Sequence, residues 1–199
     1  MGNGEGGPRM VSGKELALKM QNKLLTPLSA TPRNNFEHQV HVTYNPELAR
    51  FEGLPECWKD WNKQFGVPLS TVPKVDVDEI PEGIPAVLVM MRRVLRLGNG
   101  KDVVGIFRLA PDKDDCARAK HQMNSGEFDP TAPIDVNILA NLIKIWFREL
   151  EPNIFNVFED AQIVHVAGLG DAEAWGEMQN FPEPTKSLLF WLCDMMSEI

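Results

Sequence analysis

Apolar residues recur every three or four positions through much of the second half of the chain. This spacing puts them on one face of a helix and predicts helices over residues 84–97, 135–150 and 188–199. The polar stretch over residues 114–126 is also expected to be helical. The last apolar pattern continues to Ile199 without a capping glycine. We therefore expect a mostly α domain that is incomplete at its C-terminus.

The first eighty or so residues have a different pattern. Residues 1–27 form a tail that is Gly-rich at its start and is expected to be disordered, apart from a short amphipathic helix over residues 14–25. Apolar or aromatic side chains then alternate from Val40 to Tyr44, which predicts an extended strand. The chain after that strand is rich in proline and aspartate and has few periodic apolar runs, which is typical of irregular backbone. The expected order is a tail (1–27), an extended segment (28–58), a linker (59–79) and a helical domain (80–199).

Composition and charge narrow the classes of function. The 199 residues are 43% hydrophobic, which is enough for a core, and the net charge of −8 argues against nucleic-acid binding. The sequence has neither an apolar run of about 18 residues nor a secretory signal, and Gly6 stands where myristoylation prefers Ser or Thr. Cys57, Cys116 and Cys193 are widely spaced and odd in number, so we expect a reducing, cytoplasmic environment.

The extended segment contains two histidines, His38 and His41, in the stretch FEHQVHV. A zinc site is disfavoured, because two residues three apart on a strand point to opposite faces and only Cys57 offers a further ligand. The alternative that the pattern alone supports is a half-exposed strand with ordinarily hydrogen-bonded histidines. We therefore expect no metal site.

A wider window, LSATPRNNFEHQVHVTYNPELARFEGLPECW, resembles the CRIB motif, a segment that binds Rho-family GTPases. The matching positions are Pro32, Phe36, His38, His41, Val42, Phe51, Gly53, Leu54, Pro55 and Trp58. Ser29 lies one residue too far from Pro32, and Thr43 replaces the usual glycine, as in plant GTPase-activating proteins for ROP GTPases. The resemblance implies a strand added to the sheet edge of a GTP-bound partner. The implied contact residues are Phe36, His38, His41, Val42, Phe51, Gly53, Pro55 and Trp58.

A second short stretch, VVGIFRLA over residues 103–110, places one arginine, Arg108, in an apolar run. An arginine at the end of such a run can simply extend its tip into water. The alternative is a presented loop, because Gly105 permits a tight turn and Pro111 follows the run.

The helix predicted over residues 135–150 has a broad apolar arc and a narrow polar one. Asn141, Lys144 and Arg148 lie on the polar arc, and the two cations are four residues apart. A solvated helix face is the ordinary interpretation of such a pair. The spacing alone therefore does not assign them a function.

Both stretches resemble parts of the RhoGAP domain. VVGIFRLA is similar to that family's arginine-finger loop, EGIFRxSG, and LANLIKIWFREL to its helix LPxxLLKxFLREL. The resemblance implies that Arg108 is the catalytic finger and that Lys144, Arg148 and Asn141 support the loop or bind the GTPase. Val104 replaces the common glutamate, and the family's late Asn-x-Leu-Ala-x-x-Phe-x-Pro stretch has no counterpart in this sequence.

The two resemblances together imply a GTPase-activating protein for a Rac-, Cdc42- or ROP-like GTPase, arranged as in plant ROP GAPs. The alternative is an effector or scaffold that binds the GTPase without catalysis. In either case the expected partner is the GTP-bound Rho-family GTPase, which carries the GTP and Mg²⁺ itself, so the chain needs no cofactor of its own. Its only expected link to the plasma membrane is the lipidated GTPase.

Overall fold

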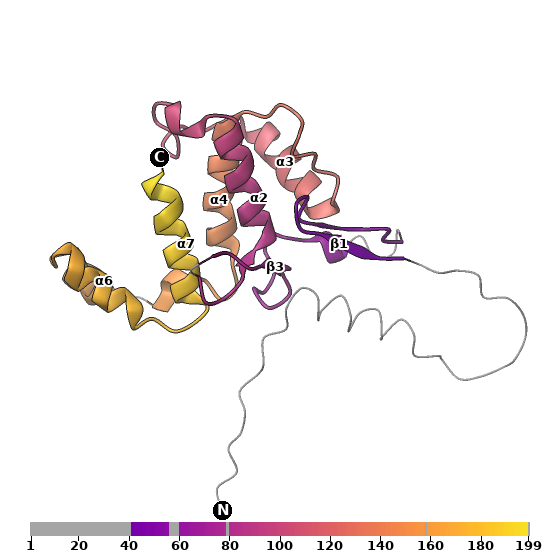
Figure 1. Cartoon of the computed structure of the whole chain (residues 1–199). Coiled ribbons are helices and arrows are strands. Elements are labelled where there is room, and N and C mark those ends of the chain that lie inside the picture. The colour runs from indigo at the N-terminus through magenta and orange to yellow at the C-terminus, as the bar shows by residue number, and fades with distance from the viewer. Residues whose placement is uncertain (1–40, 56–59, 79, 158, 199) are drawn as a thin grey trace, which may run out of the picture.

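The computed structural model describes residues 41–55, 60–78, 80–157 and 159–198 (Figure 1). The described chain is mainly α-helical, which confirms the predicted fold class. Its helices are α2 (Ala86–Leu97), α3 (Lys113–Ser125), α4 (Val136–Glu149), α5 (Asp160–Ala167), α6 (Asp171–Gln179) and α7 (Thr185–Ser197), with the 3-10 turns η2 (Gly100–Asp102) and η3 (Ile154–Val157). The predicted tail over residues 1–27 and its helix over residues 14–25 lie outside the described residues.

Two small antiparallel sheets accompany the helices in the described part of the chain. Strand β1 (Thr43–Asn45) pairs with β2 (Arg50–Glu52), and β3 (Lys74–Val75) pairs with β4 (Ile84–Pro85). The predicted strand through Tyr44 is therefore present in part, since β1 covers its end. None of the described helices has the length and apolar character that spanning a membrane requires.

Helices α7, α4, α2 and α3 stand side by side and enclose the core (Figure 1). The apolar stripes predicted for α2, α4 and α7 face inward, because burying them removes apolar surface from water. The largest fully buried side chains on these three helices are Leu88, Met91, Leu95, Leu139, Leu142, Ile143, Trp146, Leu188, Trp191 and Met195. At the rim of the layer, Arg92 of α2 donates hydrogen bonds to Asp194 of α7 (2.7 Å) and to Glu198, the residue that follows α7.

Helix ends follow local signals in the sequence. The carboxylate of Asp112 accepts hydrogen bonds from two backbone amides and begins α3, while Gly126 ends it with a φ of 75°. Asp135 begins α4, and its carboxylate accepts a hydrogen bond from the backbone amide of Asn137. Helices α5 and α6 have no apolar stripe and no buried residue, so hydrophobic periodicity did not predict them.

Residues 60–78, in the segment predicted to be a linker, pack into the helical domain instead. The side chain of Phe65 is only 2% exposed, and Leu69 and Val72 are buried with it. The indole Nε1 of Trp146 donates to the carbonyl of Gln64 at 2.9 Å. Asn124 Oδ1 accepts from the amides of Gln64 (2.8 Å) and Phe65 (3.0 Å), which ties the segment to α3. A Pro- and Asp-rich composition therefore marks irregular backbone here, but the segment is part of the domain.

The β1–β2 hairpin also docks on the helical domain. The Arg50 guanidinium donates to the carbonyl of Gly126 at 2.8 Å, just beyond the end of α3. The Phe51 amide donates to Asn62 Oδ1 at 2.7 Å, and the side chain of Ala49 lies in the main core. These contacts join the hairpin, the segment over residues 60–78 and α3 into one folded unit.

Packing of the segment over residues 60–78 makes a testable prediction. We expect Phe65→Ala to lower the free energy of unfolding by about 3–5 kcal/mol, because it leaves a cavity in the core. The matched control is Lys63→Ala, at an exposed position in the same segment, which should change it by less than about 0.5 kcal/mol. Urea denaturation monitored by circular dichroism measures both values. Equal stability of the two variants would restore the linker interpretation.

Candidate functional site

The stretch VVGIFRLA forms a compact turn between η2 and α3. The amides of Arg108 and Leu109 both donate to the carbonyl of Gly105, at 2.9 and 3.0 Å. Gly105 has a φ of 81°, a conformation that glycine adopts without steric cost. Ile106 is buried and anchors the turn in the core, while Arg108 is exposed. The loop therefore presents Arg108 to solvent from an apolar base.

Helix α4 fixes this turn through Lys144. Its ammonium group donates to the backbone carbonyl of Phe107 at 2.7 Å, directly before Arg108. Phe107 has a φ of 66°, which is uncommon for a residue with a side chain. A charge-assisted hydrogen bond to this carbonyl helps hold the strained conformation. The Lys144 side chain points into its own molecule and supports the base of the loop over residues 103–110, which is called the finger loop below after the motif that it resembles.

Arg108 and Arg148 remain exposed. Neither guanidinium has a hydrogen-bond or ion-pair partner among the described residues. Arg148 lies on the polar arc of α4, one helical turn from Lys144. An arginine without an internal partner keeps its planar fork of donors available for a carboxylate or phosphate.

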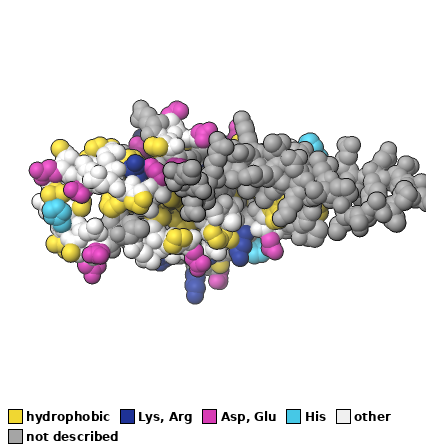
Figure 2. Space-filling model, turned by 90° about the horizontal axis from the view of Figure 1, so that it is seen from below, with side chains coloured by type: hydrophobic (Ala, Val, Ile, Leu, Met, Phe, Trp, Pro, Cys, Tyr) yellow, Lys and Arg dark blue, Asp and Glu magenta, His cyan; other side chains and the backbone are white. Residues whose placement is uncertain are grey.

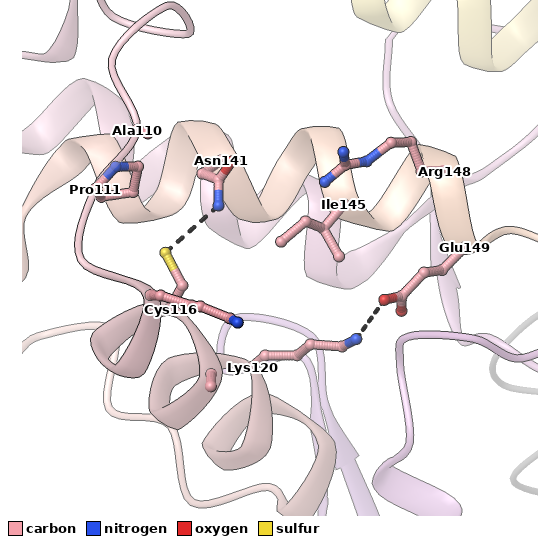
Figure 3. A pocket seen from close by; sticks show the side chains of 10 residues that line it. Ala110, Pro111, Cys116, Lys120, Asn141, Ile145, Arg148 and Glu149 are labelled. Atoms are coloured by element: carbon pink, nitrogen blue, oxygen red, sulfur yellow. Dashed lines mark hydrogen bonds and ion pairs between the residues drawn. The ribbon is translucent and has the colours of Figure 1, made fainter.

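A cleft of about 490 Å³ lies between α3 and α4, beside the end of the finger loop (Figure 3). Asn141 Nδ2 lies 3.4 Å from Cys116 Sγ on one side of it, and Lys120 forms an ion pair with Glu149. The lining residues are Ala110, Pro111, Lys113, Cys116, Ala117, Lys120, Asn141, Ile145, Arg148 and Glu149. Arg148 and Lys113 have no hydrogen-bond or ion-pair partner among the described residues, so the cleft offers positive charge on an otherwise acidic chain.

The α3 side of this cleft was not predicted from the sequence. Lys113, Ala117 and Lys120 recur at spacings of four and three, so they share a helix face. Only the packing of α3 on α4 shows that this face meets Arg148. The spacing of these residues on one helix face could be read from the sequence, but the helix that packs beside that face could not.

The CRIB-like residues are divided between described and undescribed parts of the chain. Phe36, His38 and Trp58 lie outside the described residues. His41 is exposed, Val42 and Pro55 are half-buried, and Gly53 has a φ of 75°. A β-carbon at Gly53 would lie 2.1 Å from the carbonyl oxygen of His41, so only glycine fits there.

Phe51 differs from its implied role as a GTPase contact. Its side chain is only 6% exposed, and its ring packs edge-on against Tyr44 with 4.9 Å between centroids. Burial also raises the pKa of the Tyr44 phenol. Burying both aromatic rings stabilises the hairpin on the domain. Phe51 therefore holds the folded unit together in this structure and is not presented to a partner.

Charge is mixed over the rest of the surface. In the view of Figure 2, acidic side chains are spread over the described face, with hydrophobic ones between them. No three His, Cys, Asp or Glu side chains in the described ranges are grouped as metal ligands would be. The finger loop and its adjoining cleft are thus the strongest candidate site.

Comparison with known families agrees with this geometry. Residues 85–199 match the RhoGAP domain, and residues 30–67 match the P21-Rho-binding domain, the family that contains the CRIB motif. The chain belongs to the RhoGAP domain family. The predicted order, a CRIB segment followed by a RhoGAP domain, is confirmed.

Several proteins with similar sequences are named Rho GTPase-activating proteins. The chain is 36% identical over 132 residues to Rho GTPase-activating protein gacA of Dictyostelium discoideum, covering 66% of this chain and 37% of that protein. It is 29% identical over 175 residues to Rho GTPase-activating protein 1 of Arabidopsis thaliana, covering 83% and 36%. Rho GTPase-activating protein 2 of the same plant is 28% identical over 180 residues, covering 83% and 39%. The chain thus spans under two fifths of these relatives, and no solved structure matches it.

Support of the finger loop by Lys144 can be tested without a partner. Lys144→Met keeps the length of the side chain but removes the hydrogen bond to Phe107. We expect amide hydrogen exchange at Arg108 and Leu109 to become about tenfold faster or more, because hydrogen bonds to charged groups contribute about 1.5–3 kcal/mol. Lys113→Met, at an exposed position beside the same cleft, is the control and should leave those two rates unchanged. Unchanged exchange in Lys144→Met would show that the loop holds its shape independently.

Proposed function

We propose that this protein accelerates GTP hydrolysis by a Rho-family GTPase by inserting Arg108 into the partner's nucleotide site. The observation that carries the proposal is the placement of Arg108. It is exposed on a compact turn, has no ion-pair partner among the described residues, and is held at its base by Lys144. The RhoGAP family match and the names of the relatives support the same reaction.

The chemistry follows from the charge that develops during hydrolysis. Negative charge on the transferring phosphoryl group must be compensated in the transition state. A guanidinium supplies a fixed positive charge and two parallel donors, which a lysine ammonium cannot reproduce. Because Lys144 and the turn hold the loop in place before binding, little reorganisation is needed when the arginine enters the site. GTP and Mg²⁺ belong to the partner, so the reaction is completed on the GTPase.

The cleft beside the finger loop supplies the docking surface in this proposal. Arg148 and Lys113 lie at its edge, and both are exposed. Cations at this position favour an acidic segment of the GTPase next to its nucleotide site. The surface would position the partner, while Arg108 acts on the phosphates.

The CRIB segment has a separate role in the proposal, which is to bind the GTP-bound form of the same class of GTPase. The N-terminal part of that segment precedes β1, and His41 at its end is exposed. Tethering a binding segment to the finger loop raises the local concentration of the partner. We propose that the protein works in the cytoplasm and reaches the plasma membrane only through a lipidated GTPase.

The first test of this function is single-turnover GTP hydrolysis by a Rho-type GTPase with the whole chain. Arg108→Ala is expected to reduce the maximal acceleration by about 10³-fold or more, the scale reported for arginine fingers in general. Arg108→Lys should recover little of it, because lysine lacks the planar fork. Arg118→Ala is the matched control, since Arg118 is an exposed arginine on α3 that pairs with Asp115 of its own helix. Equal acceleration by wild type and Arg108→Ala would leave a binding role without catalysis.

A second test concerns the CRIB segment. His38→Ala combined with His41→Ala should weaken binding to the GTPase loaded with a non-hydrolysable GTP analogue and leave the weaker binding to the GDP form unchanged. The physical reason is that an added strand reads the nucleotide-dependent edge of the partner through alternate side chains. Titration calorimetry with both nucleotide forms measures the difference. His121→Ala, a change at an exposed histidine of α3, is the control. Unchanged affinity of the double variant would contradict a CRIB function.

A further inference from the structure

Two exposed apolar side chains flank the proposed finger. Val104 is 92% exposed and Leu109 is 53% exposed, on either side of Arg108 in the chain. Leu97, at the end of α2, is 74% exposed. Three of the seven large apolar side chains exposed in the described part of the chain thus fall within residues 97–109. Single exposed apolar residues are ordinary, but a group of them around one functional residue calls for an explanation.

The turn closes between the residues that carry two of these side chains. The Leu109 amide donates to the Gly105 carbonyl at 3.0 Å, which closes the loop on itself. Leu109 Cγ lies 3.4 Å from the position that a β-carbon on Gly105 would occupy. Val104 precedes Gly105 directly, so Val104 and Leu109 lie at the two sides of the closed turn, with Arg108 between them in sequence.

The length of the Arg108 side chain determines how closely a partner protein must approach this loop. An extended arginine side chain is about as long as two steps between successive Cα atoms, roughly 7–8 Å. A protein that takes the Arg108 guanidinium into its nucleotide site must therefore approach the loop closely enough to cover its neighbours. Polar surface placed against Val104 would lose hydrogen bonds to water without replacement, whereas apolar surface would gain from burial.

We propose that Val104 and Leu109 form an apolar rim around Arg108, which contacts an apolar surface beside the nucleotide site of the GTPase and makes Val104 a specificity-determining residue. This inference rests on the proposed function, because the GTPase is the occupant.

The test is Val104→Ser in the whole chain, with Val104→Ile as the conservative variant. We expect Val104→Ser to raise the half-saturating concentration for single-turnover hydrolysis about tenfold, because an apolar contact is lost. Its maximal rate should stay within about threefold of wild type, and Val104→Ile should behave as wild type. Titration against the GTPase loaded with a non-hydrolysable GTP analogue measures the same loss of affinity without catalysis.

The matched control is Val164→Ser on α5, because Val164 is 73% exposed and lies outside the loop. If Val104→Ser weakens binding to the GTPase no more than Val164→Ser does, the proposal of an apolar rim is wrong. This outcome does not depend on the effect of Arg108→Ala on the rate. If Val104→Ser weakens binding while Arg108→Ala leaves the maximal rate intact, the rim stands and the catalytic finger fails. If Val104→Ile loses as much affinity as Val104→Ser, an apolar contact is not the cause and the proposal is wrong.

Discussion

The hydrogen bond from Lys144 to the Phe107 carbonyl connects the core of this domain to its candidate site. Lys144 lies on a helix whose opposite face is fully buried, so its position is set by the packing of α4. Phe107 has a φ of 66°, and the direction of its carbonyl depends on that conformation. Arg108 is the next residue, so any error in the turn would be passed directly to the guanidinium. A rigid helix thus positions a residue that has no internal partner of its own among the described residues.

Hydrophobic periodicity was sufficient to predict the helices that bury an apolar face. Residues 84–97 and 135–150 were predicted to within two residues of α2 and α4, because both carry a continuous stripe and begin beside a clear signal, Pro85 or Asp135. Helices α5 and α6 have no fully buried residue in the structure, so they leave no apolar stripe to detect. Their formation depends on capping and local propensity, which are weaker signals in a single sequence.

The candidate site could be predicted only where its residues lie close together in sequence or match a family motif. Arg108, Lys144 and Arg148 came from motif resemblance, since spacing alone favoured ordinary surface residues. The motif could not show that Lys144 points at a backbone carbonyl while Arg148 faces the cleft. It also assigned Phe51 to a partner, although the ring is buried against Tyr44. A linear motif shows which residues occur together in the sequence. It does not show which of their side chains are buried in the folded domain.

Docking of the hairpin on α3 sets the geometry between the two proposed contacts with the GTPase. Arg50 binds the carbonyl of Gly126 at the C-terminal end of α3, while the finger loop leads into its N-terminal cap at Asp112. Thirteen helical residues separate these ends by about 20 Å. The hairpin of the CRIB segment is thus fixed at one end of α3 and the finger loop at the other. Both proposed contacts with the GTPase therefore lead into one folded unit, and a single helix sets the separation between the hairpin and the finger loop.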